Sequence, residues 1–254
     1  MLKSLKPLSY AAHGSLMLQP VSDFGFASDL LMAPLAQPEL ANAAREFPIV
    51  FPAKGQPVAV LMGLEAGRNT YVSAKGKWLA QHVPYFIRLA PFAMGKLKPG
   101  ADGQQSLALL LDTESPRLSL ESGAPLFNAD KTPAPVVTEA MKSLQAFEAG
   151  RAALQLSVDA IEAAELLVDR NVLMRTDAGE GKRVTGVRVI DEQKLNALKD
   201  KNFNALRKAG ALPLVYAHLL SWGNFRRGPI GKAYPRAAQN DAAASPTGKA
   251  ASPR

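Results

Sequence analysis

The chain has 254 residues, 47% of them hydrophobic, and a formal net charge of +8. This length and apolar content allow one substantial buried core. Because cysteine is absent, disulfide bonds, thiolate nucleophiles, iron–sulfur clusters and cysteine-ligated zinc are excluded. No run of roughly 20 apolar residues predicts a transmembrane segment, and residues 7–14 lack the unbroken apolar stretch of an export signal. We therefore expect a cytoplasmic protein.

The positive charge is concentrated near the C-terminus. From Arg226 onward the sequence has six basic residues and one acidic residue, whereas most of the preceding chain is nearly neutral. Beyond Gly228 large apolar residues are few, so burial cannot offset the entropy lost on ordering. We predict a single domain over residues 1–228, whose residues 1–24 form a loosely ordered arm, and a disordered basic tail over residues 229–254.

The N-terminal half favours a small antiparallel sheet. Two apolar runs rich in β-favouring residues, 47–51 and 58–62, flank a turn-rich linker and predict a hairpin. We expect residues 69–72 to continue it as a third strand. Further expected elements are a short helix near residues 38–45, a helix-like segment over the sheet at 78–88, and a strand at 105–112.

The C-terminal half favours helices. Thr132 as a cap and Pro133 at the first helical position predict a helix start, and Gly150 predicts a break or loosening within the helical pattern. An expected hairpin pairs residues 172–176 with 184–190. Asp191 is expected to cap the next helix, and further helices are expected at residues 203–206 and 212–222. The predicted fold class is α+β, with the small sheet packed against these helices.

A set of segments spread over most of residues 25–225 resembles one family in order and spacing. The strongest are Glu46–Phe51, Val60–Leu64, Trp78–Phe92, Gly123–Phe127, Val189–Leu195, Gly210–Leu212 and Tyr216–Ser221. Together they are similar to the SapC family of bacterial proteins. The family takes its name from surface-layer protein genes, and its members resemble proteins found beside outer-membrane receptors and flavin-dependent halogenase-like genes. The sequence departs from the family pattern at His82, where an aromatic residue is usual.

The sequence contains no local motif that identifies a catalysed reaction. The dinucleotide-binding, P-loop, nucleophile-elbow and His-Glu-x-x-His patterns are all absent, so neither a metal nor a cofactor is predicted. Four acidic residues share one helical stripe: Asp159, Glu162, Glu165 and Asp169. We interpret this stripe as a solvated face rather than a metal site.

The candidate ligand-binding residues are Glu46, Trp78, Arg88, Tyr216 and His218. Glu46 and Arg88 are charges embedded in apolar segments, so they either pair internally or mark a concave site, and we favour the pair. Trp78 is a candidate pocket residue, although large aromatic residues beside a sheet are more often core. For His218, which lies between Tyr216 and Ser221, packing or hydrogen bonding is favoured over a ligand or catalytic role.

The leading functional hypothesis is a non-catalytic accessory or binding protein that recognises a peptide, a protein or a small ligand. The resemblance implies a link to surface-layer or outer-membrane receptor systems. One alternative is an enzyme whose site is assembled from distant residues. Another is weak nucleic-acid binding through the basic tail, which lacks the interleaved aromatic residues of a binding surface. We expect a protein or peptide partner rather than nucleic acid.

Overall fold

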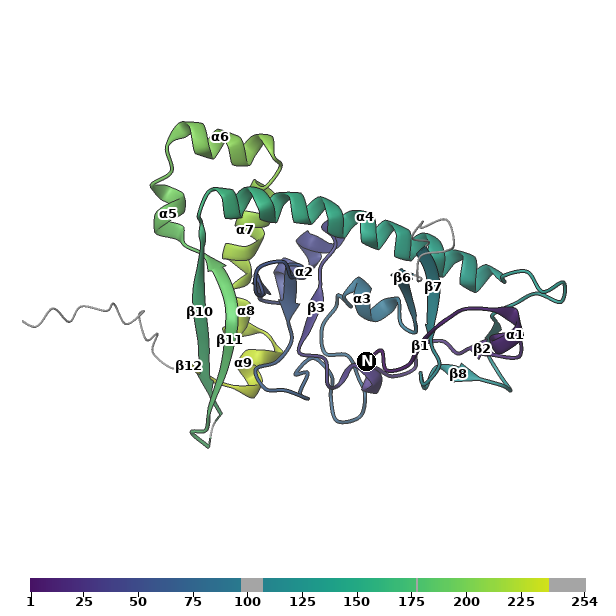
Figure 1. Cartoon of the computed structure of the whole chain (residues 1–254). Helices are drawn as coiled ribbons and strands as arrows, with labels where there is room; N and C mark the ends of the chain where they lie inside the picture. The colour runs from purple at the N-terminus through teal and green to yellow at the C-terminus, as the bar shows by residue number, and fades with distance from the viewer. Residues whose placement is uncertain (97–106, 177, 238–254) are drawn as a thin grey trace, which may run out of the picture.

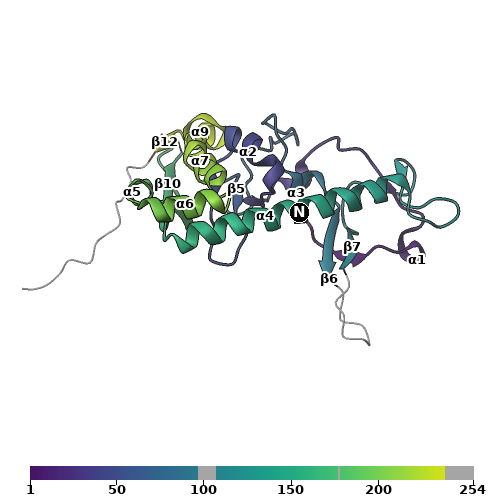
Figure 2. The same ribbon diagram turned by 90° about the horizontal axis from the view of Figure 1, so that it is seen from above.

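The computed structural model of the protein describes residues 1–96, 107–176 and 178–237. Its elements form an elongated body, and helix α4 (Pro135–Ala163) runs along most of its length (Figures 1 and 2). Most of the other elements, including most of the antiparallel strands, lie below α4 in Figure 1. The predicted α+β class is confirmed.

Strands of the described residues form four three-stranded sheets, in the orders β1-β7-β6, β8-β2-β9, β3-β5-β4 and β11-β10-β12. The first two contain β1 (Leu5–Pro7), β2 (Met17–Leu18), β6 (Phe92–Lys96), β7 (Leu107–Asp112), β8 (Leu118–Ser119) and β9 (Ala124–Pro125). The other two contain β3 (Met32–Pro34), β4 (Ile49–Val50), β5 (Ala59–Leu61), β10 (Leu167–Arg175), β11 (Gly181–Ile190) and β12 (Arg236–Ala237). The residues expected as a loosely ordered arm thus contribute β1 and β2 to two sheets.

Helices flank these sheets. In the N-terminal half they are α1 (Tyr10–His13), the 3-10 helices η1 (Gly25–Ala27) and η2 (Gln37–Glu39), α2 (Leu40–Glu46) and α3 (Tyr85–Arg88). After α4 they are α5 (Glu192–Asn196), α6 (Asp200–Lys208), α7 (Leu212–Ser221), α8 (Asn224–Arg227) and α9 (Pro229–Ala233). Asp191 caps α5 as predicted, because its carboxylate accepts the amide hydrogens of Gln193 and Lys194.

The hairpin predicted from residues 47–62 is confirmed as β4 and β5, with Ile49 opposite Val60. Its third strand is β3, however, and not residues 69–72. The Asn69 side chain accepts the Tyr71 amide hydrogen at 2.9 Å, and such a local bond competes with strand pairing. The free edge of β5 is therefore covered by β3 from earlier in the chain.

Helix α4 differs from the prediction both at its first residue and at Gly150. It begins at Pro135 and not at Pro133, because the Thr132 hydroxyl bonds to Asp130 in the preceding turn, at 2.6 Å. The helix also continues through Gly150, so the predicted break is wrong. A Cβ atom at Gly150 would lie 2.9 Å from the Pro38 ring, and the glycine therefore permits close packing of α4 against η2.

The predicted second hairpin is confirmed as β10 and β11, with Val172 opposite Val184. Its strand β11 also contacts the first hairpin, because the amide of Arg188 donates to the Phe51 carbonyl at 2.6 Å. The Arg188 guanidinium binds Glu162 on α4 at 2.7 Å. Asp159, Glu165 and Asp169 are exposed, as expected for solvated residues. The predicted common helical stripe is wrong, however, because α4 ends at Ala163 and Asp169 lies in β10.

Two apolar clusters form the interior, and α4 contributes to both. Leu154, Val158 and Ile161 join the larger cluster, which includes the sheet of β3, β4 and β5. Val137 and Leu144 join the smaller cluster with β6 and β7. A single long helix therefore ties the two ends of the body together.

The ordered body extends beyond the predicted boundary at Gly228. Residues 229–237 form α9 and β12, and Ile230 and Tyr234 are completely buried. The disorder predicted for residues 229–235 is therefore wrong, because the Ile230 and Tyr234 side chains are buried in the large cluster. Residues 238–254 of the predicted tail lie outside the described residues.

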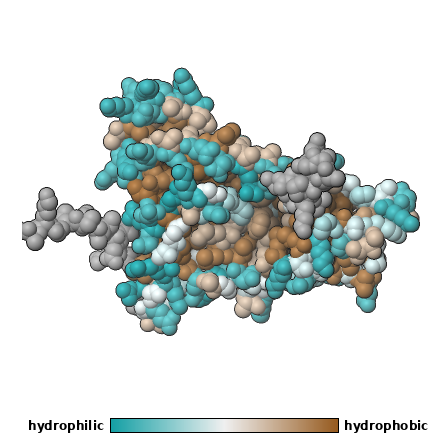
Figure 3. Space-filling view, in the orientation of Figure 1, coloured by the Kyte–Doolittle hydropathy of each residue, from teal (hydrophilic) through white to brown (hydrophobic). Residues whose placement is uncertain are grey.

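Hydrophobic residues gather near the middle of the face shown in Figure 3. Hydrophilic residues dominate the edge formed by β10 and β11. Among the described helices, none combines the length and apolar character needed to cross a membrane.

Candidate functional site

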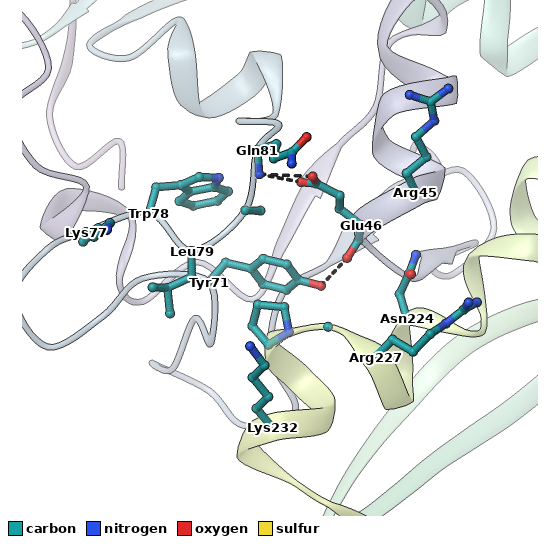
Figure 4. Close-up of a pocket in the computed structure, with 13 residues that line it drawn as sticks. Arg45, Glu46, Tyr71, Lys77, Trp78, Leu79, Gln81, Asn224, Arg227 and Lys232 are labelled. Atoms are coloured by element: carbon teal, nitrogen blue, oxygen red, sulfur yellow. Dashed lines mark hydrogen bonds between the residues drawn. The ribbon is translucent and has the colours of Figure 1, made fainter.

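A pocket of about 530 Å³ opens between the end of α2, residues 71–81, and helices α8 and α9 (Figure 4). Segments from both ends of the chain meet in it. Four of its lining residues are cationic: Arg45, Lys77, Arg227 and Lys232. The other described residues that line it are Glu46, Tyr71, Trp78, Leu79, Ala80, Gln81, Asn224, Gly228 and Pro229.

Glu46 is the last residue of α2, and its carboxylate holds the pocket wall in place. One carboxylate oxygen accepts the amide hydrogens of Gln81 and His82, each at 2.9 Å, and the other lies 3.1 Å from the Gln81 nitrogen. Bonds from backbone amides to a carboxylate are charge-assisted and stronger than neutral ones. The single carboxylate lining the described pocket therefore already has donors within the protein.

The floor of the pocket is an aromatic cluster. Tyr71 is completely buried and Trp78 is 8% exposed, and the Tyr71 ring packs on Phe47 with centroids 4.4 Å apart. The Tyr71 hydroxyl donates to the Glu46 carbonyl at 2.7 Å, and the Trp78 indole donates to the His82 carbonyl at 2.9 Å. Burial, together with the charge of Glu46, raises the pKa of the Tyr71 hydroxyl, which therefore stays protonated as a donor.

The opposite wall comes from the C-terminal helices. Asn224 at the start of α8 donates to the carbonyls of Ala44 and Phe47, at 2.9 and 3.1 Å. These bonds satisfy carbonyl groups at the end of α2 and fix α8 against it. In Figure 4 Lys232 extends from α9 toward Tyr71 and Leu79.

A second acidic residue, Glu39, secures the same wall from behind. Its side chain is completely buried, and one carboxylate oxygen lies 2.8 Å from the Tyr85 amide and 3.0 Å from His82 Nε2. The other oxygen accepts the Ala36 amide hydrogen at 3.1 Å. Sequence reasoning missed Glu39, because an acidic residue beside a proline at a helix start is typical of an exposed first turn.

Of the five candidate residues, only Glu46 and Trp78 line this pocket. Arg88 is exposed, and its guanidinium lies 5.1 Å from the centre of the Tyr85 ring. The ion pairs among the described residues do not join Glu46 to Arg88, so the favoured internal pair is not formed. Glu46 instead accepts backbone amide hydrogens, which sequence patterns do not reveal.

His218 is on the buried inner face of α7 and does not line the pocket. Its Nδ1 lies 2.8 Å from the Ile49 carbonyl, and Nε2 lies 3.1 Å from the Ile190 amide nitrogen. Nδ1 therefore carries the proton, and Nε2 also accepts from the Trp222 indole at 3.1 Å. Burial lowers the pKa of His218 to about 4, so the ring is neutral at pH 7. Tyr216, on the opposite face of α7, is 48% exposed.

The pocket and the fold together define an α+β protein with a cation-lined surface site. The sequence profile of the SapC family matches residues 8–227. The chain therefore belongs to the SapC family. No curated protein and no solved structure matches it.

Proposed function

We propose that this SapC-family chain is a binding protein whose cation-lined pocket holds an anionic ligand, either free or carried on a partner peptide. One observation carries the proposal: four cationic side chains line the pocket, while the carboxylate of Glu46 is bound to backbone amides. The remaining positive charge attracts anions. Arginine in particular binds carboxylate and phosphate groups through two parallel hydrogen bonds.

The pocket also offers apolar surface. Leu79 is 48% exposed at its rim, and Ala80 and Pro229 also line it. A ligand with a short apolar part next to its anionic group therefore suits the pocket better than a bare anion.

Binding is favoured over catalysis because the two other ionisable groups that line the pocket are engaged in hydrogen bonds within the protein. Glu46 and Tyr71 line the pocket, but both make hydrogen bonds that hold its walls. A general acid or base needs an atom within reach of the substrate's proton.

The location of the protein in the cytoplasm remains a prediction from the sequence.

Intrinsic fluorescence tests the proposal, because the chain has two tryptophans and one lies in the pocket. In a Trp222→Phe variant, Trp78 reports binding alone. We expect saturable changes with inorganic phosphate or phenylacetate, with dissociation constants on the order of 1 mM and weaker binding at high salt. Phenylacetate should bind more tightly than phosphate because it adds an apolar ring.

Charge reversal supplies the control. Arg227→Glu and Lys232→Glu, each in the Trp222→Phe background, should abolish the change, whereas Lys142→Glu on the exposed side of α4 should not. Circular dichroism verifies that each variant is folded. Anion titrations that leave Trp78 fluorescence unchanged, or that respond equally in all three variants, would refute the proposal.

A further inference from the structure

Helix α7 presents an apolar stripe on its outer face. Tyr216 and Leu220, one helical turn apart, are 48% and 75% exposed, and Pro213 on the same side is also exposed. The inner face of the helix is buried through Leu214 and His218. Single exposed apolar residues are common on protein surfaces, but aligned ones at helical spacing form a surface that another chain can cover.

This stripe leads along the chain to the cationic pocket. Helix α7 ends at Ser221, and Gly223 follows one turn after Leu220, with its amide donating to the Leu220 carbonyl at 3.4 Å. A Cβ atom at Gly223 would collide with the guanidinium of Arg227. The Arg227 side chain therefore lies against Gly223, three residues after Leu220, and it also lines the pocket.

Further positive charge surrounds this junction. Arg45 extends from α2, which packs beside α7, and Arg226 neighbours Arg227 on α8. All three arginines are exposed. Within the described part of the chain, the ion pairs do not involve any of them, so their charge faces solvent.

We infer that the outer face of α7 and the pocket form one docking surface for a segment of a partner protein. The segment presents apolar side chains one helical turn apart to Tyr216 and Leu220, and places a carboxylate next to Arg227. The positive charge of the surface favours an acidic group in the peptide. Because Arg227 follows Tyr216 and Leu220 along this surface, the carboxylate lies to one side of the peptide's apolar residues. This inference rests on the proposed function and extends it from an anion to an acidic, amphipathic peptide.

A peptide fits this surface better than a membrane does. The anionic group is received in a concave pocket of about 530 Å³, whereas a membrane-surface helix inserts one convex apolar face into the lipid. The apolar stripe is also short, so it matches two or three side chains of a peptide.

Selection from a displayed library of random dodecapeptides on the full-length protein tests the inference. We expect enriched peptides to combine at least two apolar residues with an acidic residue. The tightest synthetic peptide should bind at least tenfold more weakly to Leu220→Asp, Leu220→Ser and Arg227→Glu. Leu120→Asp, which changes a leucine that is 67% exposed elsewhere, and Lys142→Glu should bind it like the wild type.

Other outcomes would overturn the inference. These are enriched peptides without acidic residues, equal losses in the control variants, or no enrichment combined with Leu220-dependent binding to phosphatidylglycerol vesicles. The anion titration distinguishes a failure of the extended docking surface from a failure of anion binding in the pocket. If Leu220→Asp changes neither peptide binding nor phenylacetate binding, the pocket functions alone and only the extended surface fails; if phenylacetate does not bind the wild type, the proposed function itself fails.

Discussion

The buried ring of His218 predicts a specific loss of stability in acid. In the folded protein its pKa is about 4, whereas in the unfolded chain it is near the ordinary value of about 6.5. A histidine with a lowered folded pKa contributes fully above pH 6.5, and this contribution is lost as the pH falls toward 4, because the unfolded state then binds the additional proton. The loss relative to pH 8 is about 1.5 kcal/mol at pH 5.5 and about 2.5 kcal/mol at pH 4.5.

The comparison is between the wild type and His218→Gln, which does not titrate but retains a donor and an acceptor. Urea unfolding at pH 8, 5.5 and 4.5 gives the free energy of unfolding of each protein. The wild type should lose about 2.5 kcal/mol more than the variant between pH 8 and 4.5. His218→Ala should cost about 4 kcal/mol at pH 8, because buried groups of Ile49, Ile190 and Trp222 lose their partner.

Nuclear magnetic resonance measures the titration of the His218 imidazole directly. The imidazole signal that disappears in His218→Gln should titrate below pH 5. A midpoint near 6.5, or an equal acid sensitivity of wild type and variant, would refute the neutral, doubly hydrogen-bonded state of this ring.

Three further predictions concern stability and local charge. Gly150→Val should lower the free energy of unfolding by about 2 kcal/mol, because its side chain would collide with Pro38 and separate α4 from η2; an unchanged melting temperature would contradict this packing. The pKa of Glu65 is lowered to about 2, chiefly by the hydrogen bond from Tyr234 and by Lys182, so Tyr234→Phe should raise the titration midpoint of that carboxylate in a carbon-13 experiment, and an unmoved midpoint would exclude the bond. Asp191→Ala should destabilise the protein by about 1 kcal/mol while Asp191→Asn remains close to wild type, because either Asp or Asn can cap α5; equal losses would show that the cap is not responsible.

Much of the local structure was predictable because it depends on neighbouring residues. Runs rich in β-favouring residues on either side of turn residues predict both hairpins, and Asp191 before a helical pattern predicts the cap. The same reasoning failed at Gly150, because a glycine that loosens an isolated helix can instead permit close contact with another segment. It also failed beyond Gly228, where Ile230 and Tyr234 are few in number but completely buried.

The candidate site was predictable only in part. Glu46 and Trp78 were identified from their surroundings in the sequence, and both line the pocket. Arg45, Arg227 and Lys232 were not, because exposed basic residues on short helices carry no pattern that distinguishes a binding surface from ordinary solubility. Glu39 was missed for the related reason that burial of a carboxylate depends on which segments cover it.

By itself, then, the sequence determined the α+β class, the two hairpins, the capped helix and membership of the SapC family through motifs spread along the chain. The tertiary structure alone decided that β3 pairs with β5, that Glu46 binds the backbone of residues 81–82, and that α8 and α9 close a pocket begun by α2. The physical reason is distance along the chain. Hydrogen bonds and packing between neighbours follow from local composition, whereas the pocket that Glu46, Trp78 and Arg227 line together exists only after the segments that carry them have docked.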